Sequence, residues 1–466
     1  MAFLLLFSLL FEFTVITSLW PVRSPQVLCP TYIIKLEINM VNRVFVVGVG
    51  MTPFTKPKSD PNAGPHYPEL AEMAITRALT DAKLTDNKKV IEAAFAGSLF
   101  SIGAGQRCLY QVGIYDIPVT NCNNACATGS NALALARQSI MAGINDCALA
   151  FGVEKMKPGS LGGGAGGGAS PLDVHYGVLA KTHGFATAPP MSQFFGYAGL
   201  EHMKKYGTKK EHFAMIGEKN HRHSANNPYS QFRDVYSLED IMKSPTVMDP
   251  LTKLQCSPTS DGAAAAILCS EAFVIRHGLQ GQAVEIIGQS MRSDTERAFT
   301  MHDTSVAAIE VIGSGMASRC ASDVYNESGL GPDDIDVVEL HDCFSSNELI
   351  TYEALGLAKE GEGGKLIESG NATFGGKYVI NPSGGLISKG HPLGATGVAQ
   401  CAELCWQLRN ECGPRQVAGA KVGLQHNLGL GGLCVVTMYS KPAEWRGIAP
   451  RREISLAMGP PTSSNL

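Results

Sequence analysis

Residues 381–397 read NPSGGLISKGHPLGATG and set a single imidazole, that of His391, among glycines and beside a proline. Glycine lets a backbone approach a ligand closely, and Pro392 restricts the turn. An apolar stretch with helical spacing, 398–408, follows immediately. A histidine on such a loop can transfer a proton near neutral pH, although the same run also fits a buried turn histidine without chemistry.

A thiol occupies a similar position earlier in the chain. Residues 121–130 read NCNNACATGS and place Cys126 between a predicted strand, 117–121, and a predicted helix, 129–142. The free backbone N–H groups and the positive end of a helix dipole predict a pKa of Cys126 below its usual ~8.5, toward ~7. The alternative is a small buried hydrophobic residue, which is what most free cysteines are.

Two further loops follow predicted strands. The run His341-Asp342-Cys343-Phe344 comes after the strand 335–340 and before the helix 346–355, and Gly429-Leu430-Gly431-Gly432 joins two strands near the C-terminus. Ligands of α/β sheets bind at the carboxyl ends of strands. The N–H groups of a glycine turn suit an oxyanion. Together the four loops supply a nucleophile, two bases and an anion-binding turn.

Short hydrophobic strands alternate with helices along most of the chain, which predicts a mostly parallel sheet covered on both faces. The order helix, leucine, acidic turn, hydrophobic strand over 76–97 recurs over 321–341, so we expect an internal duplication. A glycine-rich run, 162–168, opens a segment rich in His and Lys that we expect to lie over the sheet as an insertion. The other predicted elements are helices over 68–83 and 306–328 and strands over 44–49, 90–97, 147–152, 261–268, 284–288, 422–426 and 433–439.

Three of these elements resemble the thiolase family, and in particular the sterol-carrier-protein type found in peroxisomes: Cys126 with residues 127–130, the His341–Phe344 run and residues 381–397. The resemblance covers about 43–439. It implies an α/β thiolase fold, with two similar βαβαβαββ halves forming a five-layered αβαβα core, an inserted loop domain and a homodimeric assembly. The implied division is an apolar extension over 1–40, an N-terminal half over 41–280 with the loop domain at about 154–250, a C-terminal half over 281–440 and a tail over 441–466. Relatives of this type continue into a sterol carrier domain, which we do not expect in the tail.

The resemblance also implies roles for the reactive side chains. Cys126 attacks the 3-keto carbon of a 3-ketoacyl-CoA, and His391 accepts its proton and later that of CoA. Most thiolases protonate the departing carbon from a Cys-x-Gly turn, but Gly429 stands at that position here. The sterol-carrier type therefore implies Cys343 as the acid, while Cys434, in a predicted strand, is expected to be core.

Two oxyanion sites and a coenzyme A site are implied as well. His341 takes the place of an asparagine that positions an oxyanion in other thiolases, and the N–H groups of Cys126 and Gly431 form the second site. Ala125 departs from the asparagine expected before the nucleophile, which puts the packing of that loop in doubt. Coenzyme A is a co-substrate, and no bound cofactor is implied. Four residues resemble those that surround coenzyme A in the family: Met191, Phe194, Phe195 and Ser257. Phe and Met at such spacing more often belong to a hydrophobic core.

Composition excludes several classes of protein. With 44% hydrophobic and 17% charged residues and a net charge of -4, the chain has a globular balance and no basic field for nucleic acid. Its 13 cysteines show neither a secreted framework nor zinc-ligand spacing, so we expect free thiols and no metal. Residues 1–20 are almost wholly apolar, yet no Lys or Arg precedes the run. A signal core or marginal anchor stays open there, and we expect no stable membrane insertion.

The resemblance to the thiolase family implies an acyltransferase that thiolytically cleaves 3-ketoacyl-CoA in peroxisomal fatty-acid oxidation. Its substrates are straight or 2-methyl-branched chains, sterol side chains included, and its products acyl-CoA plus acetyl- or propionyl-CoA. Two alternatives stay open: a condensing or decarboxylating ketoacyl synthase, against which Cys343 argues, and a non-catalytic lipid-transfer or scaffold protein, against which the complete set of reactive side chains argues. Ser464-Asn465-Leu466 lacks the basic middle residue of a peroxisomal address, which leaves room for a cytoplasmic pool.

Overall fold

The computed structural model describes residues 41–60, 63–99, 101, 103–158, 170–300 and 303–448. The predictions for 1–40, 162–168 and 464–466 therefore lie outside the described residues. The strands are β1 (Val44–Met51), β2 (Ala93–Gly97), β3 (Val119–Cys122), β4 (Cys147–Glu154), β5 (Thr246–Met248), β6 (Leu251–Thr252), β7 (Gly262–Ser270), β8 (Val284–Arg292), β9 (Val337–Glu339), β10 (Val379–Ile380), β11 (Val422–Gly429) and β12 (Leu433–Ser440). The helices are α1 (Tyr67–Asp81), α2 (Ala104–Gln111), α3 (Thr128–Met141), α4 (Asp173–Thr182), α5 (Pro190–Tyr206), α6 (Lys210–Ser224), α7 (Leu238–Lys243), α8 (Glu271–His277), α9 (Arg297–Thr300), α10 (Ala307–Val311), α11 (Ser314–Ser328), α12 (Ser345–Ala354), α13 (Gly363–Glu368), α14 (Gly385–Lys389) and α15 (Thr396–Leu408).

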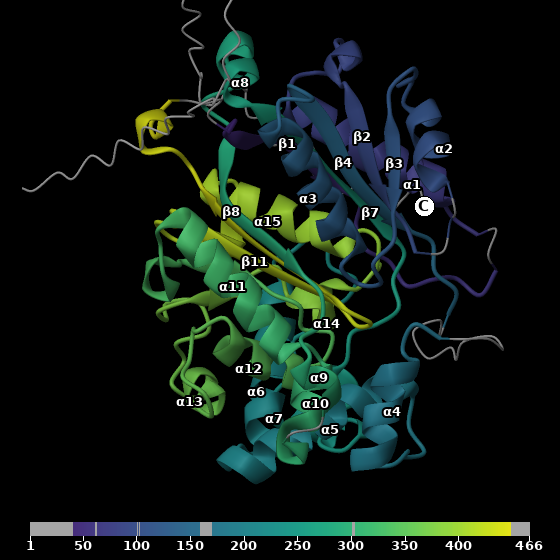
Figure 1. The fold of residues 1–466 in the computed structure, drawn as a ribbon, viewed down its shortest axis with the longest axis vertical. Coiled ribbons are helices and arrows are strands. Elements are labelled where there is room, and N and C mark those ends of the chain that lie inside the picture. Colours follow the sequence, from purple (N-terminus) through teal and green to yellow (C-terminus); the bar gives the residue numbers. More distant parts are fainter. Residues whose placement is uncertain are drawn as a thin grey trace, which may run out of the picture. The chain divides into compact units, whose positions relative to one another are not determined.

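The main sheet has ten strands in the order β10-β9-β11-β12-β8-β1-β7-β4-β2-β3 (Figure 1). Its first half, β3-β2-β4-β7-β1, and its second, β10-β9-β11-β12-β8, repeat one connectivity, as the expected duplication requires. The halves join where Phe45 and Val46 of β1 pair with Glu285 and Val284 of β8. The sheet is mixed rather than mostly parallel, because the last strand of each half, β7 or β12, pairs antiparallel with both its neighbours.

Helices cover and separate the two halves of the sheet. Alternate side chains of β1 face opposite ways: Phe45 and Val47 pack with α1, and Val44 and Val46 pack with α3 and α15. The helix α15 is buried almost all round and contacts α3, as a helix in the middle of a core must. The helix α11 covers β8 and β12. The result is the expected five-layered αβαβα core.

The segment between β4 and β7 forms the expected helical insertion, α4 to α7 with the hairpin β5–β6. Its helix α6 contacts α12, α13 and α14 of the second half. Lys219 of α6 pairs with Glu348 of α12 at 2.7 Å, and both side chains are buried. A buried charge is retained only when it is paired in this way, so the pair fixes α6 against the loops that follow β9 and β10. In the part of the chain with assigned positions, no helix is both long and apolar enough to span a bilayer.

Two expectations about the second half are wrong. The helix predicted over 306–328 is two helices, α10 and α11, because Gly313 between them has a φ of +91°, a left-handed conformation that interrupts a helix. We expected a loose tail beyond Lys441, but in the described part of it, 442–448, the chain is held on the core by Trp445. Trp445 is 8% exposed, and its ring centroid lies 4.8 Å from that of Phe45 of β1. The large apolar surface of an indole is stabilised by such burial.

Candidate active site

Loops at the carboxyl ends of strands bring the predicted reactive side chains together. Cys126 lies between β3 and α3, and His391 lies between β10 and α15. These positions are equivalent in the two halves, so the duplication itself places a thiol opposite an imidazole. His341 and Cys343 follow β9. Side chains that are far apart in the sequence thus converge on one edge of the sheet.

Cys126, His341 and His391 form a tight group. The Sγ atom of Cys126 and one ring nitrogen from each histidine all lie within 4.8 Å of one another. The two imidazole rings are 5.1 Å apart between centroids and nearly perpendicular, at 83°. Glycines permit the approach, since a Cβ on Gly152 of β4 would collide with the carbonyl of Gly394 in the His391 loop.

The hydrogen bonds of His391 define which of its nitrogens is free. The Thr396 hydroxyl donates to the carbonyl of Pro392 (3.0 Å), so it accepts from Nδ1–H of His391 (2.8 Å). The lone pair is then on Nε2, which is buried and has no partner among the described residues. Burial lowers the pKa of His391 to about 3. His391 is therefore a neutral base at pH 7, with Nε2 open to the site.

His341 has the opposite tautomer. The Asn427 side-chain amide donates to Nδ1 of His341 (3.0 Å), and its oxygen is held by the hydroxyl of Ser130 (2.9 Å). The proton of the neutral imidazole is consequently on Nε2. Burial, with His391 and His426 close by, keeps the pKa of His341 well below its usual range. One histidine thus offers a lone pair and the other an N–H.

The thiol of Cys126 has a raised pKa, not the lowered one that its position before α3 predicted. Burial raises the pKa to about 12 and outweighs the lowering by the backbone N–H, while nearby Glu154 raises it further. The free energy needed to desolvate a thiolate is larger than the stabilisation that one helix N-terminus provides. Cys126 is therefore a neutral thiol at pH 7, and it becomes a nucleophile only when a base takes its proton.

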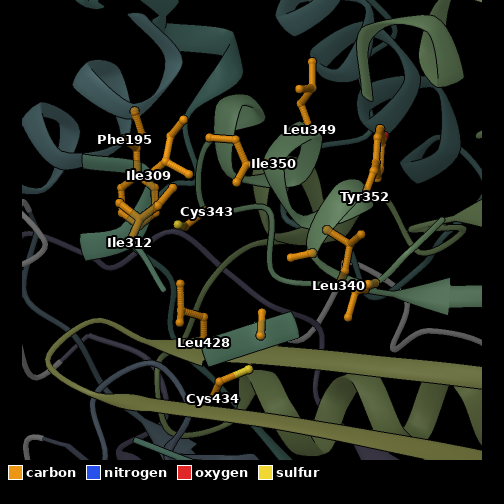
Figure 2. Packing of buried hydrophobic residues seen from close by; sticks show 14 of the residues in the cluster. Phe195, Ile309, Ile312, Leu340, Cys343, Leu349, Ile350, Tyr352, Leu428 and Cys434 are labelled. Atoms are coloured by element: carbon orange, nitrogen blue, oxygen red, sulfur yellow. The ribbon is translucent and has the colours of Figure 1, made fainter. Parts of the chain in front are cut away.

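Cys343 lies in an apolar part of the same site. Figure 2 shows it among the buried side chains Phe195, Ile312 and Leu428. Burial, and secondly the proximity of Cys126, raise the pKa of Cys343 well above its usual value. The carbonyl of Cys343 accepts from the backbone N–H of Ser257 (2.8 Å), which holds the loop in place.

Cys434 behaves as the core residue that we expected. It is fully buried in β12, and the thiol of Cys320 in α11 donates to its carbonyl at 3.5 Å. Figure 2 shows Cys434 on the strand, apart from Cys343.

The glycine turn after β11 lies against the Cys126 loop. A Cβ on Gly429 would collide with the carbonyl of Asn124 and would lie 3.1 Å from the backbone nitrogen of Ala127. Gly431 has a φ of +102°, which favours glycine. Ala125 also adopts a left-handed φ, 47°, a conformation that asparagine tolerates better than alanine. The turn and the nucleophile loop therefore stand close enough to line one site.

The sequence-based reasoning missed Asp342. Its carboxylate is fully buried and accepts the backbone N–H groups of Leu386 (2.6 Å) and Ile387 (3.2 Å) and the side-chain amide of Asn220 (2.8 Å). Leu386 and Ile387 belong to α14, directly before His391. Asp342 thus ties the loop of His341 and Cys343 to the loop of His391. The only signal in the sequence is an acid between two reactive residues, which does not reveal its partners.

Replacing Asp342 by asparagine is expected to lower the stability by about 1–3 kcal/mol, because an amide cannot accept all three hydrogen bonds. Misplacement of the two loops is expected to lower kcat by about 10- to 100-fold. Chemical unfolding and steady-state turnover measure the two effects. Asp323→Asn is the matched control, since Asp323 pairs with the half-exposed Arg292 and should change neither much. An unchanged kcat in Asp342→Asn would contradict this positioning role.

The four residues expected near coenzyme A lie in two different places, two in or on the hydrophobic core and two beside the candidate active site. Phe194 is fully buried in the hydrophobic core, and Met191 packs against that core partly exposed. Phe195 stacks on Phe344 at 4.8 Å, and Ser257 contacts Cys343, so these two adjoin the site. The side chain of Phe194 favours the core alternative that the sequence left open.

Comparison with known proteins identifies the class. The family model "Thiolase, N-terminal domain" matches residues 44–272, and "Thiolase C-terminal domain-like" matches residues 298–438. The chain belongs to the thiolase family. It is 57% identical over 405 residues to sterol carrier protein 2 of Homo sapiens, covering 86% of this chain and 73% of that protein.

One further relative and one solved structure are also similar to the chain. The chain is 48% identical over 402 residues to non-specific lipid-transfer protein-like 2 of Caenorhabditis elegans, covering 85% of this chain and 96% of that one. It shares its fold with human mitochondrial 3-ketoacyl-CoA thiolase in complex with CoA, with a TM-score of 0.63 at 21% identity over 87% of this chain and 99% of that one.

Proposed function

We propose that this protein is an acyltransferase that uses coenzyme A to cleave 3-ketoacyl-CoA into acyl-CoA plus acetyl- or propionyl-CoA. The observation that carries the proposal is the group of Cys126, His341 and His391 within 4.8 Å, one histidine presenting a lone pair and the other an N–H. Straight and 2-methyl-branched chains, with sterol side chains included, are the proposed substrates. The place of action is peroxisomal fatty-acid oxidation, and no bound cofactor takes part.

The first half of the reaction forms an acyl-enzyme. His391 Nε2 takes the thiol proton of Cys126 as the sulfur attacks the 3-keto carbon. The N–H groups of Cys126 and Gly431 stabilise the oxyanion at that carbon. The bond between the α- and β-carbons then breaks, and the enolate oxygen of the leaving acyl-CoA accepts the Nε2–H of His341. Cys343 protonates the enolate carbon.

The second half regenerates the enzyme. The proton on His391 passes to the Cys343 thiolate, which resets both groups. Coenzyme A then gives its thiol proton to His391 and attacks the thioester carbon on Cys126. As the thioester bond breaks, His391 returns this proton to the Cys126 sulfur. The high pKa of Cys126 suits this cycle, because the thiol becomes ionic only while a base holds its proton.

An assay with purified protein tests the proposal. CoA-dependent loss of a 3-ketoacyl-CoA, with acetyl- or propionyl-CoA formed in equal amount, would support it. Release of carbon dioxide without need for CoA would point instead to a ketoacyl synthase. Absence of both reactions with a folded protein would favour a lipid-transfer or scaffold role.

A homodimer is part of the proposal. The strand β3 is the outermost of the first half of the sheet, and the side chains of Thr120 and Asn121 are exposed there. An exposed sheet edge is a ready surface for pairing with a second chain. Light scattering at micromolar concentration should give twice the mass of one chain, and a monomer would refute this part.

Replacing Cys343 by alanine is expected to separate the two half-reactions. Acylation of Cys126 by a reactive acyl donor should persist, because it needs no protonated carbon, whereas cleavage of 3-ketoacyl-CoA should fall about 10²- to 10⁴-fold with the loss of the acid. Stopped-flow acylation and steady-state thiolysis measure the two rates. Cys434→Ala is the control and should retain both, and full turnover in Cys343→Ala would move the acid elsewhere.

A further inference from the structure

We propose that Cys126, His341 and His391 also bind one thiophilic divalent cation of the Zn²⁺ type and that the bound ion closes the site reversibly. The metal site needs only the geometry of the three side chains, whereas the inhibition that follows from it rests on the proposed function. No spacing along the sequence predicts such a site, because its ligands come from three separate loops.

The donor atoms match what zinc prefers. Zn²⁺ binds thiolate sulfur and neutral imidazole nitrogen, and a set of three protein ligands leaves a fourth position for water or substrate. The second, independent observation is Nε2 of His391, a buried lone pair without a partner among the residues described. Its other nitrogen donates to Thr396 at 2.8 Å, the kind of outer contact that orients a metal-binding imidazole.

The distances require a small contraction. Zn–N and Zn–S bonds of about 2.1 and 2.3 Å put tetrahedral ligand atoms about 3.4–3.6 Å apart. The three atoms here lie within 4.8 Å of one another, so no pair of them has to close by more than about 1.2–1.4 Å. Cys126 can supply much of it by rotation about its single side-chain torsion, because it is only partly buried.

The number of protons released on metal binding can be predicted and measured. His391 binds without losing a proton, since its proton is on Nδ1, which donates to Thr396, and Nε2 carries the lone pair. His341 must move its proton from Nε2 to Nδ1, and the Asn427 amide must turn its oxygen toward that nitrogen. Cys126 binds as the thiolate and releases its proton to solvent. One proton should therefore leave the protein for each ion bound.

Occupancy would remove both the nucleophile and its base. A Cys126 sulfur bound to metal cannot attack a keto carbon, and His391 Nε2 cannot accept a proton. Acyl-CoA and the ion should therefore exclude one another, and acylation of Cys126 should protect the protein from the metal.

The test uses the full chain, reduced and freed of metal, titrated with Co²⁺ and with Zn²⁺ against a chromophoric chelator. We expect each chain to bind one ion with high affinity and to release one proton. With Co²⁺ we also expect a sulfur-to-cobalt charge-transfer absorbance. Affinity should fall at least about 100-fold in Cys126→Ala and in His391→Asn, since each loses one of three ligands. Cys108→Ala, a buried cysteine of α2, is the control and should bind like the unaltered chain. Equal binding by Cys126→Ala would place the ion on other cysteines and overturn the proposal.

Asn427→Asp is expected to strengthen metal binding, whereas Cys126→Ala and His391→Asn weaken it. A carboxylate at this position would accept Nδ1–H of His341, as in carboxylate–histidine–zinc arrangements, and is expected to tighten Co²⁺ binding about 10-fold. The same change should slow thiolysis, because it favours the tautomer that lacks Nε2–H. Unchanged or weaker binding in a folded Asn427→Asp protein would remove His341 from the ligand set and refute the three-ligand site. Spectroscopic binding in a protein without thiolase activity would leave the metal site standing and reject the proposed function instead.

Discussion

Replacing Cys126 by alanine is expected to abolish the acyl-enzyme and to reduce thiolysis by about 10⁴-fold or more, because the variant lacks the sulfur that forms the thioester beside the base His391. Intact-protein mass spectrometry after mixing with a 3-ketoacyl-CoA should show one acyl group on the unaltered chain and none on the variant. Peptide mapping should place that group on Cys126.

Cys256→Ala is the matched control for this experiment. Cys256 is also a free thiol near the site, and its β-bridge to Phe344 places it beside the loop of Cys343. It should leave acylation in place. An acyl group trapped on another residue of Cys126→Ala would reject the assignment of the nucleophile.

Replacing His391 by asparagine is expected to slow acylation of Cys126 by about 10²- to 10⁴-fold at pH 7. Burial raises the pKa of Cys126 to about 12, so a negligible part of the thiol is ionised without a base. Asparagine fills similar space and offers no basic nitrogen. Single-turnover acylation measures the loss directly.

The pH dependence of this variant should differ from that of the unaltered chain. The pKa of His391 is about 3, so its base form is complete above that value, and acylation by the unaltered chain should show no histidine titration between pH 5 and 8. In His391→Asn the thiolate forms only through solvent, so the rate should rise about tenfold per pH unit below the pKa of Cys126. A flat, fast profile in the variant would show that another group takes the proton.

A milder substitution tests the hydrogen bond between Thr396 and His391. Thr396→Val keeps the shape of the side chain but removes the oxygen that accepts Nδ1–H of His391. Acylation should then be slower than in the unaltered chain and faster than in His391→Asn, because both tautomers become accessible. This order would support Thr396 as a positioning residue.

Local signals in the sequence predicted the elements and the loops of this protein. Short hydrophobic runs predicted strands such as β4 and β11, and the glycines around His391 predicted a loop that a ligand could approach. Motif resemblance placed Cys126, His341, Cys343 and His391 in one family pattern. The predictions of strands and loops succeeded because hydrophobic patterning and backbone freedom depend on neighbouring residues.

Three predictions from local sequence patterns were wrong: the pKa of Cys126, the single helix over 306–328 and the loose chain just after Lys441. The position of Cys126 before a helix predicted a lowered pKa, yet burial by segments from both halves raises it. The apolar pattern over 306–328 predicted one helix, although Gly313 breaks it. The residues after Lys441 were predicted to form a loose tail, but Trp445, in the described part of that tail, packs on Phe45 of β1.

What the sequence by itself determined, then, is the order of strands and helices, the family and the set of reactive side chains. Only the tertiary structure decided that Cys126 and His391 meet at equivalent points of two repeated halves, that Thr396 and Asn427 give the two histidines opposite tautomers, and that Asp342 joins their loops. The physical reason is that proton position, desolvation and metal-binding geometry depend on the atoms surrounding a group, and those atoms come from parts of the chain that lie far away in sequence.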